Sequence, residues 1–149
     1  MFRVSKLVLC VFVAAACFAQ NAGQSTQSHS GQAFQALVQD AKTRVTEMNV
    51  DQLKSAKGSG EKLTLIDVRE DNEWAAGHAS GAVHMSKGVI ERDIESKVPE
   101  KNSKVVLYCG SGARSALAAD SLMKMGYTNV FSLAGGMSAY QKAGLPVEK

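Results

Sequence analysis

The spacing of hydrophobic residues divides the chain into segments of two kinds. In one kind, apolar residues recur three or four positions apart, as in helices with one buried face. In the other kind, short apolar runs stand between polar turns, as in buried strands. The helical spacing occurs in 31–48, 50–57, 70–76, 89–98, 114–125 and 136–143, and the strand pattern occurs in 63–68, 82–85, 104–108 and 129–133. Because strands alternate with helices from residue 50 onward, the chain is predicted to be an α/β protein with a mainly parallel sheet.

The first helical segment, 31–48, precedes the alternating pattern. Its apolar residues follow a helical period: Phe34, Leu37, Val38, Ala41, Val45 and Met48. We expect one amphipathic N-terminal helix that packs on the domain and binds no ligand.

The first nineteen residues differ in character from the rest. Arg3 and Lys6 give a basic start, an apolar run follows from Leu7 to Ala16, and the first acidic residue is Asp40. This order is typical of a secretory signal peptide, which we predict for 1–19. The apolar run is too short for a transmembrane span, which needs about 20 residues. The alternative is an uncleaved anchor at the membrane interface.

The sequence leaves two processing sites open. Ala19, with Cys17 two residues before it, suits ordinary cleavage after Ala19. The run Ala14-Ala15-Ala16-Cys17 instead resembles a lipoprotein box, in which Cys17 would be lipidated. The polar stretch 20–30 would serve as a tether or a flexible end in either case. We expect an exported protein, periplasmic or secreted, with membrane attachment only if Cys17 is lipidated.

The composition allows one globular domain, which we place at 50–149. Of the 149 residues, 45% are hydrophobic and 21% are charged, and the formal net charge of +3 is too small to suggest a nucleic-acid partner. The three histidines have no metal-ligand spacing with the cysteine at 109, so we expect neither a metal nor another cofactor.

Cleavage of the signal would leave Cys109 as a lone cysteine in an oxidising compartment. A buried apolar cysteine is one explanation. The residues after it favour another, because Gly110 and Gly112 separate a strand from a helix and leave the backbone amides free to form an anion-binding nest. The helix N-terminus adds a positive end, so the thiol should titrate below its ordinary value of about 8.5. Arg114 could bind an incoming oxyanion with two hydrogen bonds. An ordinary glycine-rich turn is the alternative.

Several segments together resemble the rhodanese family of sulfurtransferases, over roughly 50–147. They are Ile66-Asp67-Val68-Arg69-Glu70, Glu73-Trp74, Gly77-His78-Ala79-Ser80-Gly81-Ala82, Tyr108-Cys109-Gly110-Ser111-Gly112-Ala113-Arg114-Ser115, Gly126-Tyr127-Thr128-Asn129-Val130 and Leu133-Ala134-Gly135-Gly136-Met137.

The resemblance implies a three-layer fold with a five-stranded sheet and a reaction in two steps. A thiolate takes the outer sulfur of a small anionic donor such as thiosulfate or a polysulfide, and cyanide or a thiol then accepts it. The implied nucleophile is Cys109, and the implied cradle is Gly110, Ser111, Gly112, Ala113, Arg114 and Ser115. Asp67, Arg69 and His78 would support the loops, with Arg69 paired to Glu73. Where this sequence has Gly110, the family often has a basic residue.

Two alternatives to this enzyme remain. Phosphatases and arsenate reductases of the same fold have five residues between cysteine and arginine, whereas four stand between Cys109 and Arg114. The shorter loop favours sulfur over phosphoryl transfer. The other alternative is a sulfur carrier or protein-interaction module without turnover, for which the helix ahead of the domain leaves room for a protein partner.

Overall fold

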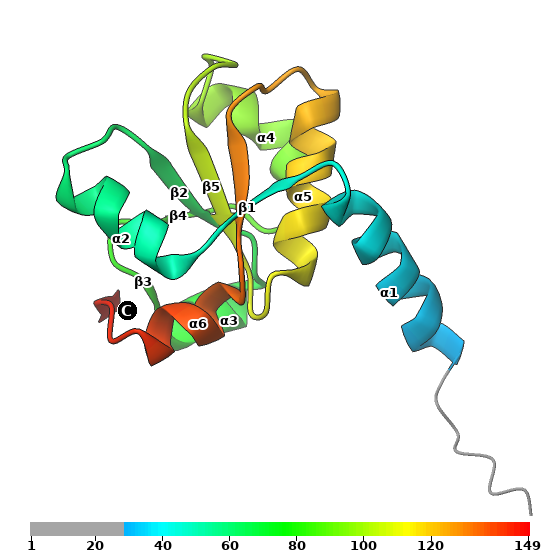
Figure 1. Cartoon of the computed structure of the whole chain (residues 1–149), viewed down its shortest axis with the longest axis horizontal. Helices are drawn as coiled ribbons and strands as arrows, with labels where there is room; N and C mark the ends of the chain where they lie inside the picture. Colours follow the sequence, from blue (N-terminus) through cyan, green and yellow to red (C-terminus); the bar gives the residue numbers. More distant parts are fainter. Residues whose placement is uncertain (1–28) are drawn as a thin grey trace, which may run out of the picture.

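The computed structural model describes residues 29–149, so the predicted signal peptide, both candidate processing sites and most of the 20–30 tether lie outside the described residues. One sheet of five strands organises the chain (Figure 1). Its order is β1-β6-β5-β2-β4, and every neighbouring pair is parallel. The strands are β1 (Thr46–Met48), β2 (Thr64–Asp67), β4 (Val83–His84), β5 (Val105–Tyr108) and β6 (Val130–Leu133). The predicted α/β class with a five-stranded parallel sheet is confirmed.

Helices cover both faces of the sheet and make the three layers. The helices α2 (Val50–Gly58) and α6 (Gly136–Lys142) lie on one face, and α4 (Ile90–Lys97) and α5 (Ala113–Lys124) lie on the other (Figure 1). The short helix α3 (Asp71–Ala76) follows the carboxyl end of β2.

The central strands are buried on both sides, which explains their unbroken apolar sequence. Successive residues of β5 alternate between two cores: Val105 and Leu107 pack with α4 and α5, while Val106 and Tyr108 pack with α2 and α6. The carboxyl end of β5 therefore emerges between two filled cores. Ligands in parallel α/β sheets bind at that edge.

The predicted N-terminal helix over 31–48 is wrong at both ends. The helix α1 runs from His29 to Lys42, and the chain then turns and forms β1, which pairs with β6. Val45 and Met48 lie beyond the end of this helix, but both are buried. Their apolar character therefore reflects burial, and their fit to the helical period was a coincidence. The sheet consequently begins before residue 50, where the sequence placed the start of the domain.

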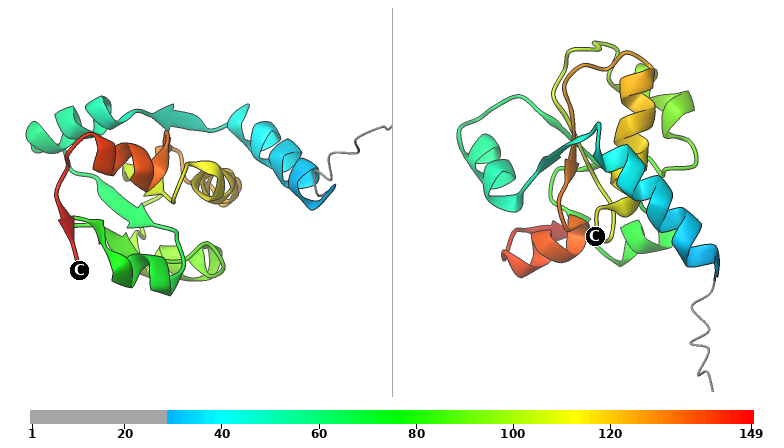
Figure 2. Two further views of the ribbon diagram at one scale, coloured as in Figure 1. Left: turned by 90° about the horizontal axis from the view of Figure 1, so that it is seen from below. Right: turned by 45° about the vertical axis from the view of Figure 1, so that its right-hand side comes forward.

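The helix α1 packs on α5 along only one side. Val38 and Ala41 are buried in this contact, whereas Phe34 and Leu37 are exposed. The amino-terminal part of α1 projects from the body of the molecule (Figures 1 and 2). Within residues 29–149 no helix combines the length and apolar character needed to cross a membrane.

A second, two-stranded sheet holds the end of the chain. The strand β3 (His78–Ala79) pairs antiparallel with β7 (Val147–Glu148), and the Ser80 amide donates a hydrogen bond of 3.0 Å to the Pro146 carbonyl. The hydrophobic pattern indicated neither strand, because two residues are too few for a period. The pairing fixes the segment that begins with Gly77 and His78, called the Gly-His segment below, beside the C-terminal strand β7.

Candidate active site

The loop from Cys109 to Gly112 joins the carboxyl end of β5 to the start of α5. Gly112 precedes the first helical residue with φ of +98°, a conformation that side chains disfavour. A Cβ atom there would lie 3.3 Å from both the Gly135 nitrogen and the Leu133 carbonyl oxygen. A glycine is therefore required at position 112, where the backbone amide lies next to the Cys109 sulfur.

Hydrogen-bond donors surround the sulfur of Cys109, which is 1% exposed. The Gly112 amide lies 3.2 Å from Sγ, and the Ser115 hydroxyl lies 3.7 Å from it. Burial by itself raises the pKa of this thiol. The amide and hydroxyl of Ser115 and the amides of Ser111 and Gly112 outweigh burial, so the pKa of Cys109 lies below its ordinary value. The loop thus stabilises a thiolate.

The first residues of α6 donate hydrogen bonds to the backbone of the cysteine loop. The Met137 amide donates a 2.7 Å hydrogen bond to the Cys109 carbonyl, and the amide and hydroxyl of Ser138 both donate to the Gly110 carbonyl. A Cβ atom at Gly136 would overlap the Cys109 carbonyl oxygen. The hydrophobic pattern does not indicate this support, although two consecutive glycines at 135 and 136 signal a close backbone approach.

Arg114 is bound to a carboxylate in the structure. Its Nη1 and Nη2 lie 2.6 and 2.8 Å from the two carboxylate oxygens of Glu73 on α3. The hydrogen bonds that Arg114 donates hold the pKa of Glu73 at about 2, and the same bonds to the Glu73 carboxylate raise the pKa of Arg114 above its ordinary value. The predicted pairing of Arg69 with Glu73 is therefore wrong, and the predicted oxyanion ligand Arg114 already has a partner.

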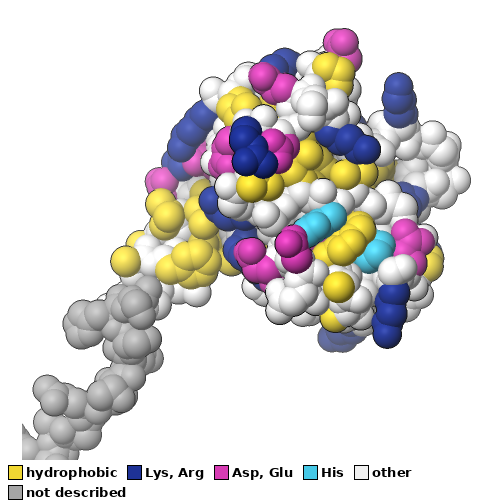
Figure 3. Space-filling view, turned by 180° about the vertical axis from the view of Figure 1, so that it is seen from behind, with side chains coloured by type: hydrophobic (Ala, Val, Ile, Leu, Met, Phe, Trp, Pro, Cys, Tyr) yellow, Lys and Arg dark blue, Asp and Glu magenta, His cyan; other side chains and the backbone are white. Residues whose placement is uncertain are grey.

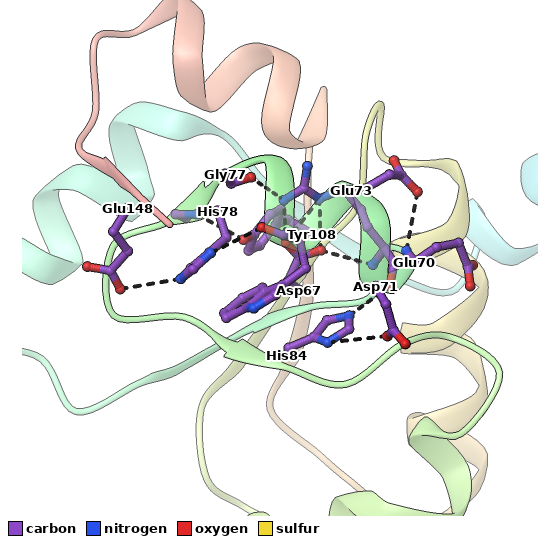
Figure 4. Close-up of polar contacts among 12 residues, drawn as sticks. Asp67, Glu70, Asp71, Glu73, Gly77, His78, His84, Tyr108 and Glu148 are labelled. Carbon is purple, nitrogen blue, oxygen red and sulfur yellow. Dashed lines mark hydrogen bonds and ion pairs between the residues drawn. The ribbon is translucent and has the colours of Figure 1, made fainter.

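Asp67 and Arg69 form a buried ion pair of their own. Arg69 Nη2 lies 2.6 Å from Asp67 Oδ2 and 2.8 Å from the Gly77 carbonyl oxygen (Figure 4). Asp67 is paired in register with Tyr108, the residue before the cysteine. The pair thus ties the end of β2 to the Gly-His segment.

A family model described as a rhodanese-like domain matches residues 49–143. This chain belongs to the rhodanese-like domain family. A sulfurtransferase of Allochromatium vinosum is 36% identical over 103 residues, which cover 69% of this chain and 94% of the relative. The thiosulfate sulfurtransferase of Escherichia coli is 38% identical over 72 residues, which cover 48% of this chain and 68% of that relative.

A solved structure agrees with these relatives. The polysulfide-sulfur transferase homodimer of Wolinella succinogenes has a TM-score of 0.67 and 25% identity, covering 83% of this chain and 92% of that one. Similarity to several sulfurtransferases supports sulfur transfer of the rhodanese type as the activity of this domain.

The residues predicted around the rhodanese-like site fall into two groups. Cys109, Gly112 and Ser115 converge on one sulfur atom, whereas His78 contacts other residues. Its ring stacks on Trp74 with the centroids 3.4 Å apart, and its Nε2 lies 3.6 Å from a carboxylate oxygen of Glu148 (Figure 4). His78 thus packs on Trp74 of α3 and contacts Glu148 of β7.

Trp74 stacks on a second histidine, His84, at a centroid distance of 5.0 Å. His84 is half-buried, and its Nε2 lies 3.0 Å from the Arg69 carbonyl oxygen. On this face of the rhodanese-like domain, histidines flank hydrophobic side chains and acidic side chains lie beside them (Figure 3).

Proposed function

We propose that this domain transfers a sulfane sulfur through a persulfide on Cys109. One observation carries the proposal: the Gly112 amide and the Ser115 hydroxyl are both directed at a buried sulfur with a lowered pKa. The thiolate, not the thiol, is the nucleophile toward a sulfane sulfur.

The same amides would stabilise the product. In the first step the Cys109 thiolate attacks the outer sulfur of the donor, the donor's sulfur–sulfur bond breaks, and its electron pair leaves with sulfite or a thiolate. The new terminal sulfur would lie beside the same loop, whose amides favour a negative charge. In the second step cyanide or a thiolate attacks that terminal sulfur, and the Cys109 thiolate is released.

We also propose that the transfer takes place outside the cytoplasm. The basic start and the short apolar run of 1–19 support export, and the polar stretch 20–30 would separate a membrane or cleavage site from the domain. The mature N-terminal mass of protein from a host that exports it distinguishes cleavage after Ala19, lipidation at Cys17 and retention of the segment.

Intact mass spectrometry tests the sulfur chemistry. We expect the mature protein to gain the mass of one sulfur atom after incubation with thiosulfate or a polysulfide, and to lose it on addition of cyanide. Cys109→Ser should gain nothing while its circular dichroism stays unchanged, and Cys17→Ser is the matched control in protein that retains the segment. Failure to load sulfur from any donor, with a titratable thiol, would contradict the proposal.

The assay also separates an enzyme from a carrier. A sulfurtransferase regenerates its free thiol and produces thiocyanate repeatedly when thiosulfate and cyanide are both in excess. A carrier would load one sulfur per chain, and thiocyanate would stop at one equivalent.

A further inference from the structure

Two carboxylates face the guanidinium of Arg114. Glu73 binds it with both oxygens, and a Glu70 oxygen lies 3.6 Å from its Nη1. One positive charge thus stands against two negative charges. The arginine of the loop does not add positive charge to the entrance of the site.

The ion pair of Arg114 and Glu73 lies directly over Gly110. A Cβ atom at that glycine would be 3.6 Å from Arg114 Nη2 and 3.9 Å from Glu73 Oε1. Gly110 follows the cysteine and carries no side chain that could supply a cation in place of Arg114. A donor that approaches the Cys109 sulfur across Gly110 therefore meets a neutralised arginine and a carboxylate.

Donors of different charge respond differently to this surface. When the Cys109 thiolate attacks thiosulfate, one negative charge on the thiolate meets two on the donor. The total stays at three when sulfite leaves and the persulfide anion forms. Attack on an alkyl hydropersulfide, R–S–SH, involves one negative charge: its sulfur–sulfur bond breaks, the electron pair leaves on RS⁻, and the proton stays on the transferred sulfur as Cys109–S–SH. Nearby carboxylates disfavour the first reaction more strongly than the second, because repulsion grows with the charge of the donor.

We propose that Glu73 is a specificity-determining residue: by neutralising Arg114, it selects alkyl persulfides with an uncharged or cationic alkyl group over the dianion thiosulfate. This inference rests on sulfur transfer through Cys109, as proposed above. It names the donor class for that site and assigns the choice to a residue outside the cysteine loop.

A series of donors with graded charge tests the selectivity. The probes are the persulfides of cysteamine, 2-mercaptoethanol and 3-mercaptopropionate, which carry an ammonium, a hydroxyl and a carboxylate, together with thiosulfate. The measurement is the second-order rate constant of sulfur loading on the mature protein, followed by mass spectrometry in wild type and in Glu73→Gln. Comparing each donor with itself in the two proteins cancels differences in leaving-group reactivity.

Glu73→Gln removes the charge and retains the shape of the contact. Glutamine can still accept from Arg114 and can replace the glutamate at the N3 position of the α3 capping box. In Glu73→Gln we expect the rate constant for loading by thiosulfate to rise by about tenfold and that for the carboxylate-bearing persulfide to rise by less. The rate constant for the ammonium-bearing persulfide should fall by about threefold. Charge effects of this size are usual near a partly exposed site. The matched control is Glu61→Gln, because Glu61 pairs with Lys104 just before β5, at the opposite end of the strand from Cys109.

Two results would overturn the inference and leave the proposed function intact. One is an equal fall for all four donors in Glu73→Gln, which would mean that Glu73 only positions Arg114. The other is the same donor profile in Glu73→Gln and Glu61→Gln. Loading by none of the donors would instead contradict the proposed function itself.

A measurement on the wild type covers the case in which Glu73→Gln does not fold. Added salt screens charge, so loading by thiosulfate should accelerate and loading by cysteamine persulfide should slow as ionic strength rises. Slower loading by thiosulfate in salt would show that the site attracts the dianion, and would overturn the inference.

Discussion

The hydroxyl oxygens of Ser115 and Ser132 lie 2.9 Å apart in the buried layer behind the Cys109 sulfur. When Ser115 donates its proton to the sulfur, its oxygen accepts the proton of Ser132. The thiolate is thus the end of a short chain of hydroxyl groups that reaches β6.

Removing the first hydroxyl should raise the pKa of Cys109. Ser115→Ala leaves the amides in place but deletes one hydrogen-bond donor that stabilises the thiolate, so we expect the pKa to rise. At neutral pH less thiolate would then be present, and alkylation by iodoacetamide should slow. The midpoint of its pH profile measures the shift. Ser132→Ala should move the midpoint in the same direction by less, and an unchanged midpoint in Ser115→Ala would show that its hydroxyl does not donate to the sulfur.

The contact of α6 with the loop leaves no space for a methyl group at position 136. We expect Gly136→Ala to lower the free energy of unfolding by about 3 kcal/mol, through overlap with the Cys109 carbonyl and a φ of +53°. Urea denaturation measures this, and sulfur loading should fall with it. Gly58→Ala is the control, since nothing lies within 4 Å of the added carbon and its φ is not positive. Equal effects of the two variants would contradict the assigned contact.

The buried pair of Asp67 and Arg69 should matter far more than an exposed pair of the same geometry. Asp67→Ala leaves the guanidinium buried without its carboxylate, and we expect a loss of about 3–5 kcal/mol in urea denaturation. Arg92 and Asp93 are also 2.6 Å apart but lie at the surface, so Asp93→Ala should change stability little. A similar loss in both variants would argue against burial as the cause.

Acid should weaken the attachment of α1. The Asp120 carboxylate on α5 accepts hydrogen bonds from Arg44, just after α1, and from Lys124, which hold its pKa at about 2 against an ordinary 3.8. A lowered pKa stabilises the fold fully above pH 3.8, and this contribution disappears as the pH falls through 2. The difference in melting temperature between wild type and Asp120→Asn should therefore be constant from pH 7 to 5, shrink between pH 4 and 2, and vanish below pH 2. A difference that persists in full below pH 2 would exclude the charge as its origin.

Features encoded within one segment could be predicted from the sequence, and features made by distant segments could not. The cysteine loop lies between a strand and a helix over 109–115, so its amides could be placed from the order of residues alone. Glu73 and Arg114 are 41 positions apart, and no local pattern connects them. The strand β1 was missed for a related reason: Met48 is buried through pairing with β6, far along the chain, and its spacing also fits a helix.

The chain is synthesised from its N-terminus, so the cysteine loop is made before the residues of α6 that donate hydrogen bonds to it. Cys109 leaves the ribosome before Met137 and Ser138, which bind the loop carbonyls. Until those residues emerge, the carbonyls of Cys109 and Gly110 lack the hydrogen bonds that hold the loop in place. Maturation of the reactive thiol is thus tied to completion of the polypeptide, and shortened products that end before α6 would carry a cysteine that lacks this support.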